Sequence, residues 1–256
     1  MLPRPSKLVL TLFWLTAAAM APVQAGNPTA PSREQMEGQM LATEMRTLQP
    51  ASGATNNGFL EVRDHEGRRT RIPLVIETRV GDVNGWSTRY VTHPNPPAVP
   101  ETLTILHYPG RSLAYVLEAG GKAGAEVLPA GQGFTPFAGS DFWLADLGLE
   151  FLHWPDQRIL PGLGNTPPMT KGRPCKILES RNPAGGPYSR VVSWVDNEFK
   201  SLIRADAYDT GGKLLKQFSI GSFKKVDGVW LLKDMEMIDE RRDTKTRLEF
   251  ELKVAE

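Results

Sequence analysis

Cysteine is almost absent from this sequence, because Cys175 is the only one among 256 residues. A single cysteine cannot form an intramolecular disulfide, which excludes a small secreted scaffold held together by disulfide bonds. Its distance from the N-terminus also excludes a lipid-modified N-terminal cysteine. Cys175 lies in a strand-like run at residues 172–180 with no base beside it. We therefore expect a small buried hydrophobic residue and not a catalytic thiol.

An excess of charge of one sign is missing as well. The 30 lysines and arginines nearly balance 29 aspartates and glutamates, which gives a formal net charge of +1. Binding to a polyanion usually needs a strong positive excess. We therefore expect no nucleic-acid partner.

Catalytic and metal-binding motifs are also lacking. The four histidines include no pair with the spacing of metal ligands, and there is no HExxH motif. Neither G-x-S-x-G, a P-loop, nor a G-x-G-x-x-G that opens a helix occurs. The sequence therefore predicts no enzymatic activity, no cofactor and no bound metal ion.

The N-terminus carries a continuous apolar run. Arg4 and Lys7 precede it, it covers residues 8–21, and residues 23–25 after it are small at the first and third positions. This order is that of a secretory signal peptide, and the run is shorter than the roughly 20 residues of a membrane span. We expect residues 1–25 to be a signal peptide, residues 26–256 to form a single domain, and the protein to lie in the periplasm. An uncleaved membrane anchor is the alternative.

One amphipathic helix is predicted at the start of the mature chain. Ser32 and Gln35 have the spacing of a capping box, and Pro50 ends the pattern. Methionine dominates the apolar face, and a methionine stripe either packs in a core or adapts to ligands of varied shape. Both roles stay open for this face, which consists of Met36, Met40, Leu41, Met45 and Leu48.

From residue 58 onwards the hydrophobic pattern has the period of β-strands. In the last strand, Leu248, Phe250 and Leu252 alternate with charged residues. Such alternation indicates a sheet with one apolar face and one wet face. Turn signals separate about ten such segments, which predicts an antiparallel meander with few helices. This pattern favours a curved sheet or open barrel over a sandwich.

Residues 137–157 interrupt the strands with an unusually apolar segment. Its hydrophobic residues fit one helix that Ser140 would cap and Pro155 would end. Glycine-rich stretches at residues 118–139 and 160–171 flank it, as a hinged flap would require. The segment either covers an apolar cavity as a lid or fills a core.

Polar residues on this helix would be few. Asp146, Glu150 and His153 would share one face. That face could bind a divalent metal ion, but a solvated stripe on an apolar helix is the favoured interpretation.

Several segments together resemble the periplasmic outer-membrane lipoprotein-sorting protein family, which is related to the Lol lipoprotein carriers. They lie in the same order and at similar spacing over more than a hundred residues, at positions 139–157, 172–180, 188–196, 206–219 and 223–230. The resemblance implies a mainly β fold with some α, an open incomplete antiparallel β-barrel formed by a curved sheet, with a helical lid. It also implies an apolar concave face that shelters acyl chains.

The expected function is therefore that of a monomeric, non-enzymatic periplasmic carrier or binding protein. Its ligand would be an acylated lipoprotein or another lipid-like molecule, and the resemblance adds an inner-membrane transporter as a possible partner. The alternatives are a sensor or interaction module that binds a peptide or a transporter, and a metal-dependent hydrolase. The residues expected to line the cavity and lid are Met36, Met40, Phe137, Phe142, Trp143, Leu147 and Phe151.

Overall fold

The computed structural model describes residues 30–81, 85–120, 124–162, 167–226 and 228–252. The predicted signal peptide, residues 1–25, lies outside the described residues. Described residues from Pro31 onwards belong to one compact unit. Among the described helices, none combines the length and apolar character that crossing a bilayer requires.

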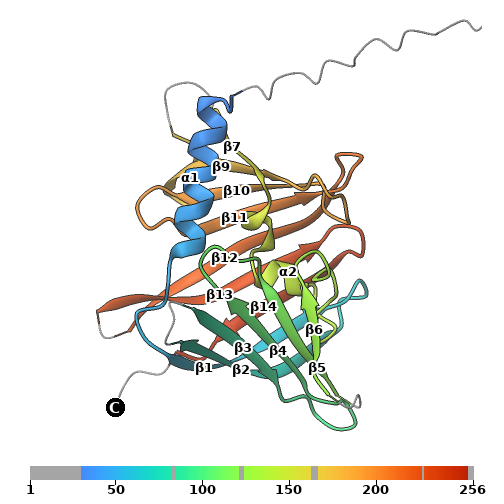
Figure 1. The fold of residues 1–256 in the computed structure, drawn as a ribbon. Helices are drawn as coiled ribbons and strands as arrows, with labels where there is room; N and C mark the ends of the chain where they lie inside the picture. Colours follow the sequence, from blue (N-terminus) through green and yellow to red (C-terminus); the bar gives the residue numbers. More distant parts are fainter. Residues whose placement is uncertain (1–29, 82–84, 121–123, 163–166, 227, 253–256) are drawn as a thin grey trace, which may run out of the picture. The chain divides into compact units, whose positions relative to one another are not determined.

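One antiparallel sheet of 14 strands forms the body of this unit (Figure 1). Its path runs β6-β5-β4-β3-β2-β1-β14-β13-β12-β11-β10-β9-β7, and β8 pairs with β9 beside that path. The strands are β1 Ala54–Arg63, β2 Arg69–Val80, β3 Trp86–Thr92, β4 Glu101–His107, β5 Ala114–Ala119, β6 Glu126–Pro129, β7 Asp156–Leu160, β8 Met169–Thr170, β9 Arg173–Arg181, β10 Arg190–Asp196, β11 Leu202–Tyr208, β12 Leu214–Val226, β13 Val229–Asp239 and β14 Thr244–Phe250.

Two series of hairpins make up this order. Strands β1 to β6 form one series and β9 to β14 the other, and they join where β1 pairs with β14, with Gly58 opposite Phe250. The sheet is curved and its two end strands, β6 and β7, are not paired with each other. This confirms the predicted open, incomplete barrel. The predicted number of strands was too small, because no strand was predicted for β6 and β8, which lie inside the glycine-rich stretches, or for β7, which follows the apolar segment.

Helix α1, Arg33–Thr47, confirms the predicted helix and its capping box. The Gln35 amide donates to Ser32 Oγ over 3.2 Å, and the Ser32 amide donates to Gln35 Oε1 over 2.8 Å. Leu41 is buried, but the exposed fractions of Met36 and Met40 are 48% and 71%. Core packing is therefore the wrong interpretation for these two methionines, because they lie on the outer side of the helix.

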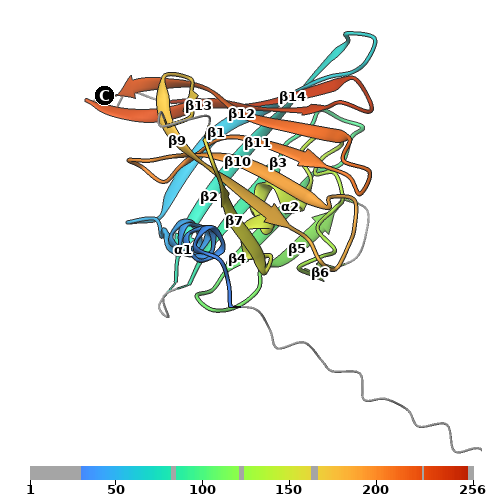
Figure 2. The same cartoon turned by 90° about the horizontal axis from the view of Figure 1, so that it is seen from above.

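The backbones of α1 and β7 approach each other closely at Gly38. A Cβ atom on Gly38 would lie 2.4 Å from the Cα atom of Arg158. Only glycine allows this contact, since any side chain would overlap the β7 backbone. Figure 2 shows α1 beside β7, at the end strand of the sheet.

Residues 130–155, between β6 and β7, are called the inserted segment. It contains a single α-turn, α2 Leu144–Leu147, and a 3₁₀ turn, η1 Glu150–His153. Figures 1 and 2 show α2 on the inner side of the curved sheet.

A continuous helix from Phe142 to Trp154 is wrong. Leu149 breaks it by adopting a left-handed conformation with φ of 50°. The amides of Leu144 and Ala145 donate to the carbonyls of Thr135 and Gly133, which replaces the predicted cap by Ser140. Contacts within the inserted segment thus compete successfully with helical hydrogen bonds.

Three apolar clusters form the core of the described residues, and the inserted segment supplies residues to the two larger ones. Trp143 and Phe151 pack with β9, β10 and β11, while Phe137 and Phe142 pack with strands β1 to β5 and β14. The segment therefore joins the two halves of the sheet from the inside. Cys175 is buried in a third cluster with Ile203, as the sequence predicts for a small hydrophobic residue.

Candidate functional site

The concave face of the sheet and the inserted segment that covers it form the candidate site. Of the seven residues expected to bind a ligand, five lie in this segment. Leu147 is half-buried, and the other four are buried with exposed fractions of 7% or less, namely Phe137, Phe142, Trp143 and Phe151. Met36 and Met40 are exposed on α1 and do not join them. A ligand-binding role for all seven residues stays a prediction.

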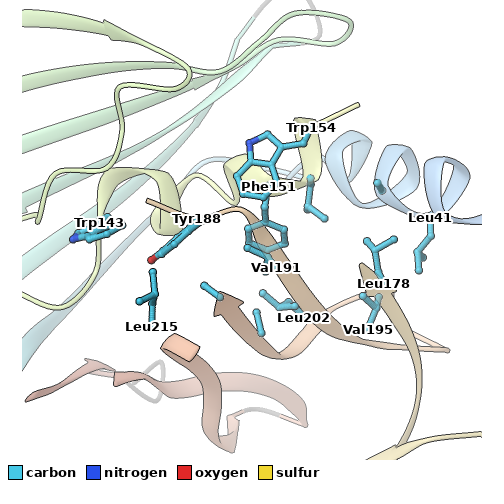
Figure 3. Close-up of a cluster of buried hydrophobic side chains, with 14 residues drawn as sticks. Leu41, Trp143, Phe151, Trp154, Leu178, Tyr188, Val191, Val195, Leu202 and Leu215 are labelled. Atoms are coloured by element: carbon cyan, nitrogen blue, oxygen red, sulfur yellow. The ribbon is translucent and has the colours of Figure 1, made fainter. Parts of the chain in front are cut away.

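Aromatic side chains form the centre of the covered face. The rings of Trp143 and Tyr188 are stacked, with centroids 4.9 Å apart and an angle of 20° between planes. The Phe134 ring packs edge-on against both, with its centroid 5.8 Å from that of Trp143 and 5.4 Å from that of Tyr188. Figure 3 shows the side chain of Phe151 directed toward Val191 of β10.

Little space remains between the inserted segment and the concave face. The cavity beneath the segment has a volume of about 20 Å³, enough for about one water molecule. Its walls are mainly apolar and include Phe151, Leu202, Ala205, Ala207, Phe218 and Met237. The inserted segment therefore fills the apolar face that a hydrophobic ligand would need.

A buried lysine lies beneath this apolar packing. Lys216 of β12 has a side chain that is 1% exposed, and its Nζ is 3.5 Å from the ring centroid of Trp143. The ammonium donates to the carbonyl of Asp141 over 2.7 Å and to Asp146 Oδ2 over 3.2 Å. Burial lowers the pKa of Lys216, and the Asp146 carboxylate opposes that change. The lysine thus joins β12 to the inserted segment.

Asp146 is surrounded by donors from three directions. Besides Lys216, the Tyr188 hydroxyl donates to its Oδ1 over 3.0 Å and the Trp143 amide to its Oδ2 over 2.9 Å. Burial and the nearby carboxylate raise the pKa of Tyr188 well above its ordinary value. The carboxylate is therefore a structural acceptor that orients both stacked rings.

Asp141 attaches the start of the segment to the last hairpin of the sheet. Its Oδ1 accepts from Arg242 over 2.6 Å and from the Thr244 hydroxyl over 2.5 Å. Its Oδ2 accepts from the Thr246 hydroxyl over 2.8 Å. All three contacts to the Asp141 carboxylate come from protein side chains, so the carboxylate needs no added cation.

The predicted solvated stripe of Asp146, Glu150 and His153 is wrong. Glu150 is buried, and its carboxylate accepts from the Tyr115 hydroxyl over 2.7 Å and from the Gly131 amide over 2.8 Å. Because the helix is broken at Leu149, the three side chains do not share one face. Within the described part of the chain, no three histidine, cysteine, aspartate or glutamate side chains form a metal-binding group.

Lys216 is the residue of this site that the sequence interpretation missed. A signal was present, because Lys216 shares the parity of Leu214 and Phe218 in a strand with period two. A lysine at an apolar position of a strand indicates a buried cation with a specific partner. Its partner in the inserted segment, Asp146, could not be identified from spacing.

Comparison with known proteins places the chain in a family and a fold. A family model described as that of an uncharacterized protein matches residues 127–254, which is half of the chain. No curated protein matches the sequence.

Three solved structures share the fold over most of their length. A DUF1329 family protein from Desulfovibrio piger has a TM-score of 0.67 at 19% identity, covering 86% of this chain and 92% of that chain. An outer membrane lipoprotein-sorting protein domain from Vibrio parahaemolyticus has a TM-score of 0.70 at 15% identity, covering 85% and 92%. A LolA superfamily protein from Nitrosomonas europaea has a TM-score of 0.55 at 14% identity, covering 88% and 95%. The chain belongs to the family of uncharacterized proteins whose model it matches, and it has the fold of outer membrane lipoprotein-sorting proteins and of the LolA superfamily.

Proposed function

We propose that this protein is a periplasmic carrier or binding protein for the acyl chains of a lipoprotein or a similar lipid, and that it performs no catalysis. The observation that carries the proposal is the apolar concave face, which is filled by a segment of the same chain and not by a regular core element. In this proposal the inserted segment is a cover that a ligand displaces. Its aromatic and aliphatic residues occupy the place of acyl chains.

The exchange replaces one set of apolar contacts by another. Each buried CH₂ group contributes about 0.8 kcal/mol, so a long acyl chain offsets a large part of the apolar contacts that the segment would lose. The polar contacts of Asp141 and Asp146 return to water when the segment leaves, and their net cost is smaller than their number suggests. The exchange needs no covalent step.

The compartment and the partners follow from two further observations. The N-terminal sequence has the pattern of a secretory signal. A structure with the same fold is named as an outer membrane lipoprotein-sorting protein domain. We propose the periplasm as the location, an acylated lipoprotein or lipid as the ligand, and an inner-membrane transporter as the source of that ligand.

Native mass spectrometry of the full chain, purified from the periplasm without detergent, is the first test. A near-stoichiometric acylated species in the spectrum, identified after solvent extraction, would support the carrier function. A clean mass of the protein alone would contradict it. A stable complex with a membrane protein and no bound lipid would instead favour an interaction module.

A second test asks whether the inserted segment must move. Thr246 Oγ1 lies 2.8 Å from Asp141 Oδ2, so cysteines at these two positions are within reach of a disulfide once Cys175 is replaced by alanine. The reduced form should bind the fluorescent fatty acid cis-parinaric acid, and the oxidised form should not. Equal binding by both forms would show that the segment need not leave the sheet. That result would overturn the proposal that a ligand displaces the inserted segment.

Substitution of the aromatic cover gives a third test. Trp143→Ser combined with Leu147→Ser weakens the packing of the cover against the sheet, so the affinity for cis-parinaric acid should rise while the β-sheet circular dichroism stays unchanged. Unchanged or weaker binding would contradict a cover that the ligand displaces. Phe199→Ser is the matched control, because Phe199 is 63% exposed. Loss of the sheet signal in the double variant would identify Trp143 and Leu147 as core residues.

A further inference from the structure

A second, larger pocket lies beside the C-terminal end of α1 and shares no residue with the cavity under the inserted segment. Its volume is about 420 Å³. We call it the α1 pocket, and its walls come from the last turns of α1, the turn between β4 and β5, β3 and η1. The residues used below are Arg46, Trp86, His107, Tyr108, Arg111 and His153.

The charged residues of the α1 pocket are of one sign. Arg46 and Arg111 line it, and no aspartate or glutamate does. Among the residues that the structure describes, no carboxylate lies within 4.0 Å of either guanidinium; Arg46 contacts the Thr43 hydroxyl, and Arg111 lies 5.9 Å from the Tyr108 ring centroid. Burial lowers the pKa of Arg46, as expected for a half-buried cation without an anionic partner.

The negative end of the α1 dipole does not cancel these cations. A helix C-terminus carries a partial charge of about −0.5, and its effect is limited to the last turn. Two full positive charges exceed it. The pocket therefore presents a net positive site for which the described residues supply no counter-ion.

An aromatic wall runs along the same pocket. The rings of Trp86 and His107 are stacked at a centroid distance of 3.6 Å with an angle of 3° between planes. Tyr108 continues this wall and is 46% exposed. An inorganic anion would leave most of this apolar surface and volume unused.

We propose that the α1 pocket binds an organic phosphate monoester. Its phosphate would accept hydrogen bonds from Arg46 and Arg111, and its organic part would lie along the Trp86–His107–Tyr108 wall. A phosphate monoester carries between about −1.5 and −2 charges at neutral pH, which matches two arginines better than a single carboxylate does. Two sources supply this chemistry, a lipid headgroup and a soluble phosphate monoester, and the last test below distinguishes them. The inference does not rest on the proposed carrier function.

Titration calorimetry at low ionic strength with phenyl phosphate is the direct test. The double substitution Arg46→Gln and Arg111→Gln should weaken binding at least about tenfold, because both charge-assisted contacts are lost. Arg33→Gln is the matched control, since it removes the same charge from the same helix at a side chain that is 84% exposed. The affinity of the Arg33→Gln variant for phenyl phosphate should stay within about twofold of that of the unmodified protein. Equal affinity of the double variant, with an unchanged melting temperature, would overturn the proposal.

The aromatic wall has its own test. Trp86→Leu should weaken phenyl phosphate binding and leave inorganic phosphate binding unchanged. If inorganic phosphate binds as tightly as phenyl phosphate to the unmodified protein, the organic part has no site and the proposal fails.

Vesicle flotation then distinguishes the two sources of the phosphate. Vesicles containing phosphatidic acid, compared with vesicles of phosphatidylcholine alone, should carry the protein only if the pocket takes a lipid headgroup. Loss of this flotation in the double arginine variant would support the headgroup form. Phenyl phosphate binding without flotation would support the same pocket with a soluble ligand. Both outcomes are independent of the fatty-acid binding that tests the concave face.

Discussion

Helix α1 and the inserted segment both pack on the curved sheet, but contacts of very different sequence range stabilise them. The capping box of α1 joins residues three positions apart. The inserted segment depends on Asp141, which bonds residues 101 to 105 positions away, and on Lys216, which is 75 positions from Asp141. Helix α1 is therefore stabilised by contacts between residues close in the sequence, whereas the conformation of the inserted segment depends on the sheet that it covers.

This difference has a consequence for what each element can do. A regular helix satisfies its own backbone groups wherever it lies. The inserted segment has one α-turn and one 3₁₀ turn, and it relies on side chains from β5, β12 and β14 for its polar contacts. The conformation of the segment therefore depends on the folded sheet, because its polar partners lie on distant strands.

The largest expected effect comes from the long-range contacts. Lys216→Met leaves Asp146 buried without its cation, and removal of one partner of a buried pair should lower the free energy of unfolding by about 3–5 kcal/mol. Urea denaturation at pH 7 measures this change. The exposed pair Arg33–Glu37 is the control, and Arg33→Gln should cost less than about 1 kcal/mol.

A double substitution tests whether the two residues act as a pair. Lys216→Met with Asp146→Asn should be less destabilising than the two single changes added together, because no buried charge is then left alone. Additive effects would mean that Lys216 does not hold the inserted segment through Asp146.

The contact between α1 and β7 should give a smaller effect. Gly38→Ala places a methyl group 2.4 Å from the Arg158 Cα atom, and such overpacking should cost about 1–3 kcal/mol. Gln39→Ala, next to it on the exposed side of the helix, should change stability by less than about 0.5 kcal/mol. If Gly38→Ala were neutral or stabilising, α1 would not be in close contact with β7.

The local contacts of α1 should matter less again. Ser32→Ala removes the capping side chain and should cost about 1 kcal/mol. Thermal unfolding followed by circular dichroism measures it. A cost as large as that of Lys216→Met would remove the contrast between the two elements.

The smallest effect on stability at pH 7 is expected for His153 and His107. These histidines line the α1 pocket, where η1 of the inserted segment lies near Arg46 of α1. Burial, and then the charge of Arg46, lowers the pKa of His153 to about 4, and burial, and then His153, lowers the pKa of His107 to about 4. Both ordinary values lie near 6.5, so the unfolded chain takes up these protons first and acid favours unfolding. Stability should therefore fall as pH drops from about 6.5 to about 4.

Urea denaturation over this pH range checks the sign. His107→Gln should show a shallower fall than the unmodified protein, while carboxylates contribute equally to both curves. Parallel curves would show that His107 takes up no additional proton on unfolding.

Much of the fold could be predicted because it depends on local patterns. The capping box, the methionine-containing helix, the buried Cys175 and the open antiparallel sheet all appear in the structure. Strand alternation and turn residues are properties of short stretches of chain, and they need no knowledge of distant partners.

The candidate site was predicted less well. The apolar residues of the inserted segment were identified, but its continuous helix and its solvated acidic stripe were not found. The hydrophobic period suggested a helix, and nothing local showed that Gly133, Thr135 and Tyr115 would compete for its backbone and side chains.

By itself, the sequence determined most of the strands, where α1 begins, and that residues 137–154 must lie against an apolar surface. Hydrophobic periodicity and helix capping depend on residues a few positions apart, so both can be recognised in the sequence. Only the tertiary structure decided that Asp141, Asp146 and Glu150 point inward, that Lys216 meets Trp143, and that the concave face is already filled. A buried charge is tolerated only when a group of opposite charge or a hydrogen-bond donor lies beside it. For these residues such partners come from distant strands, so only the folded sheet brings them together.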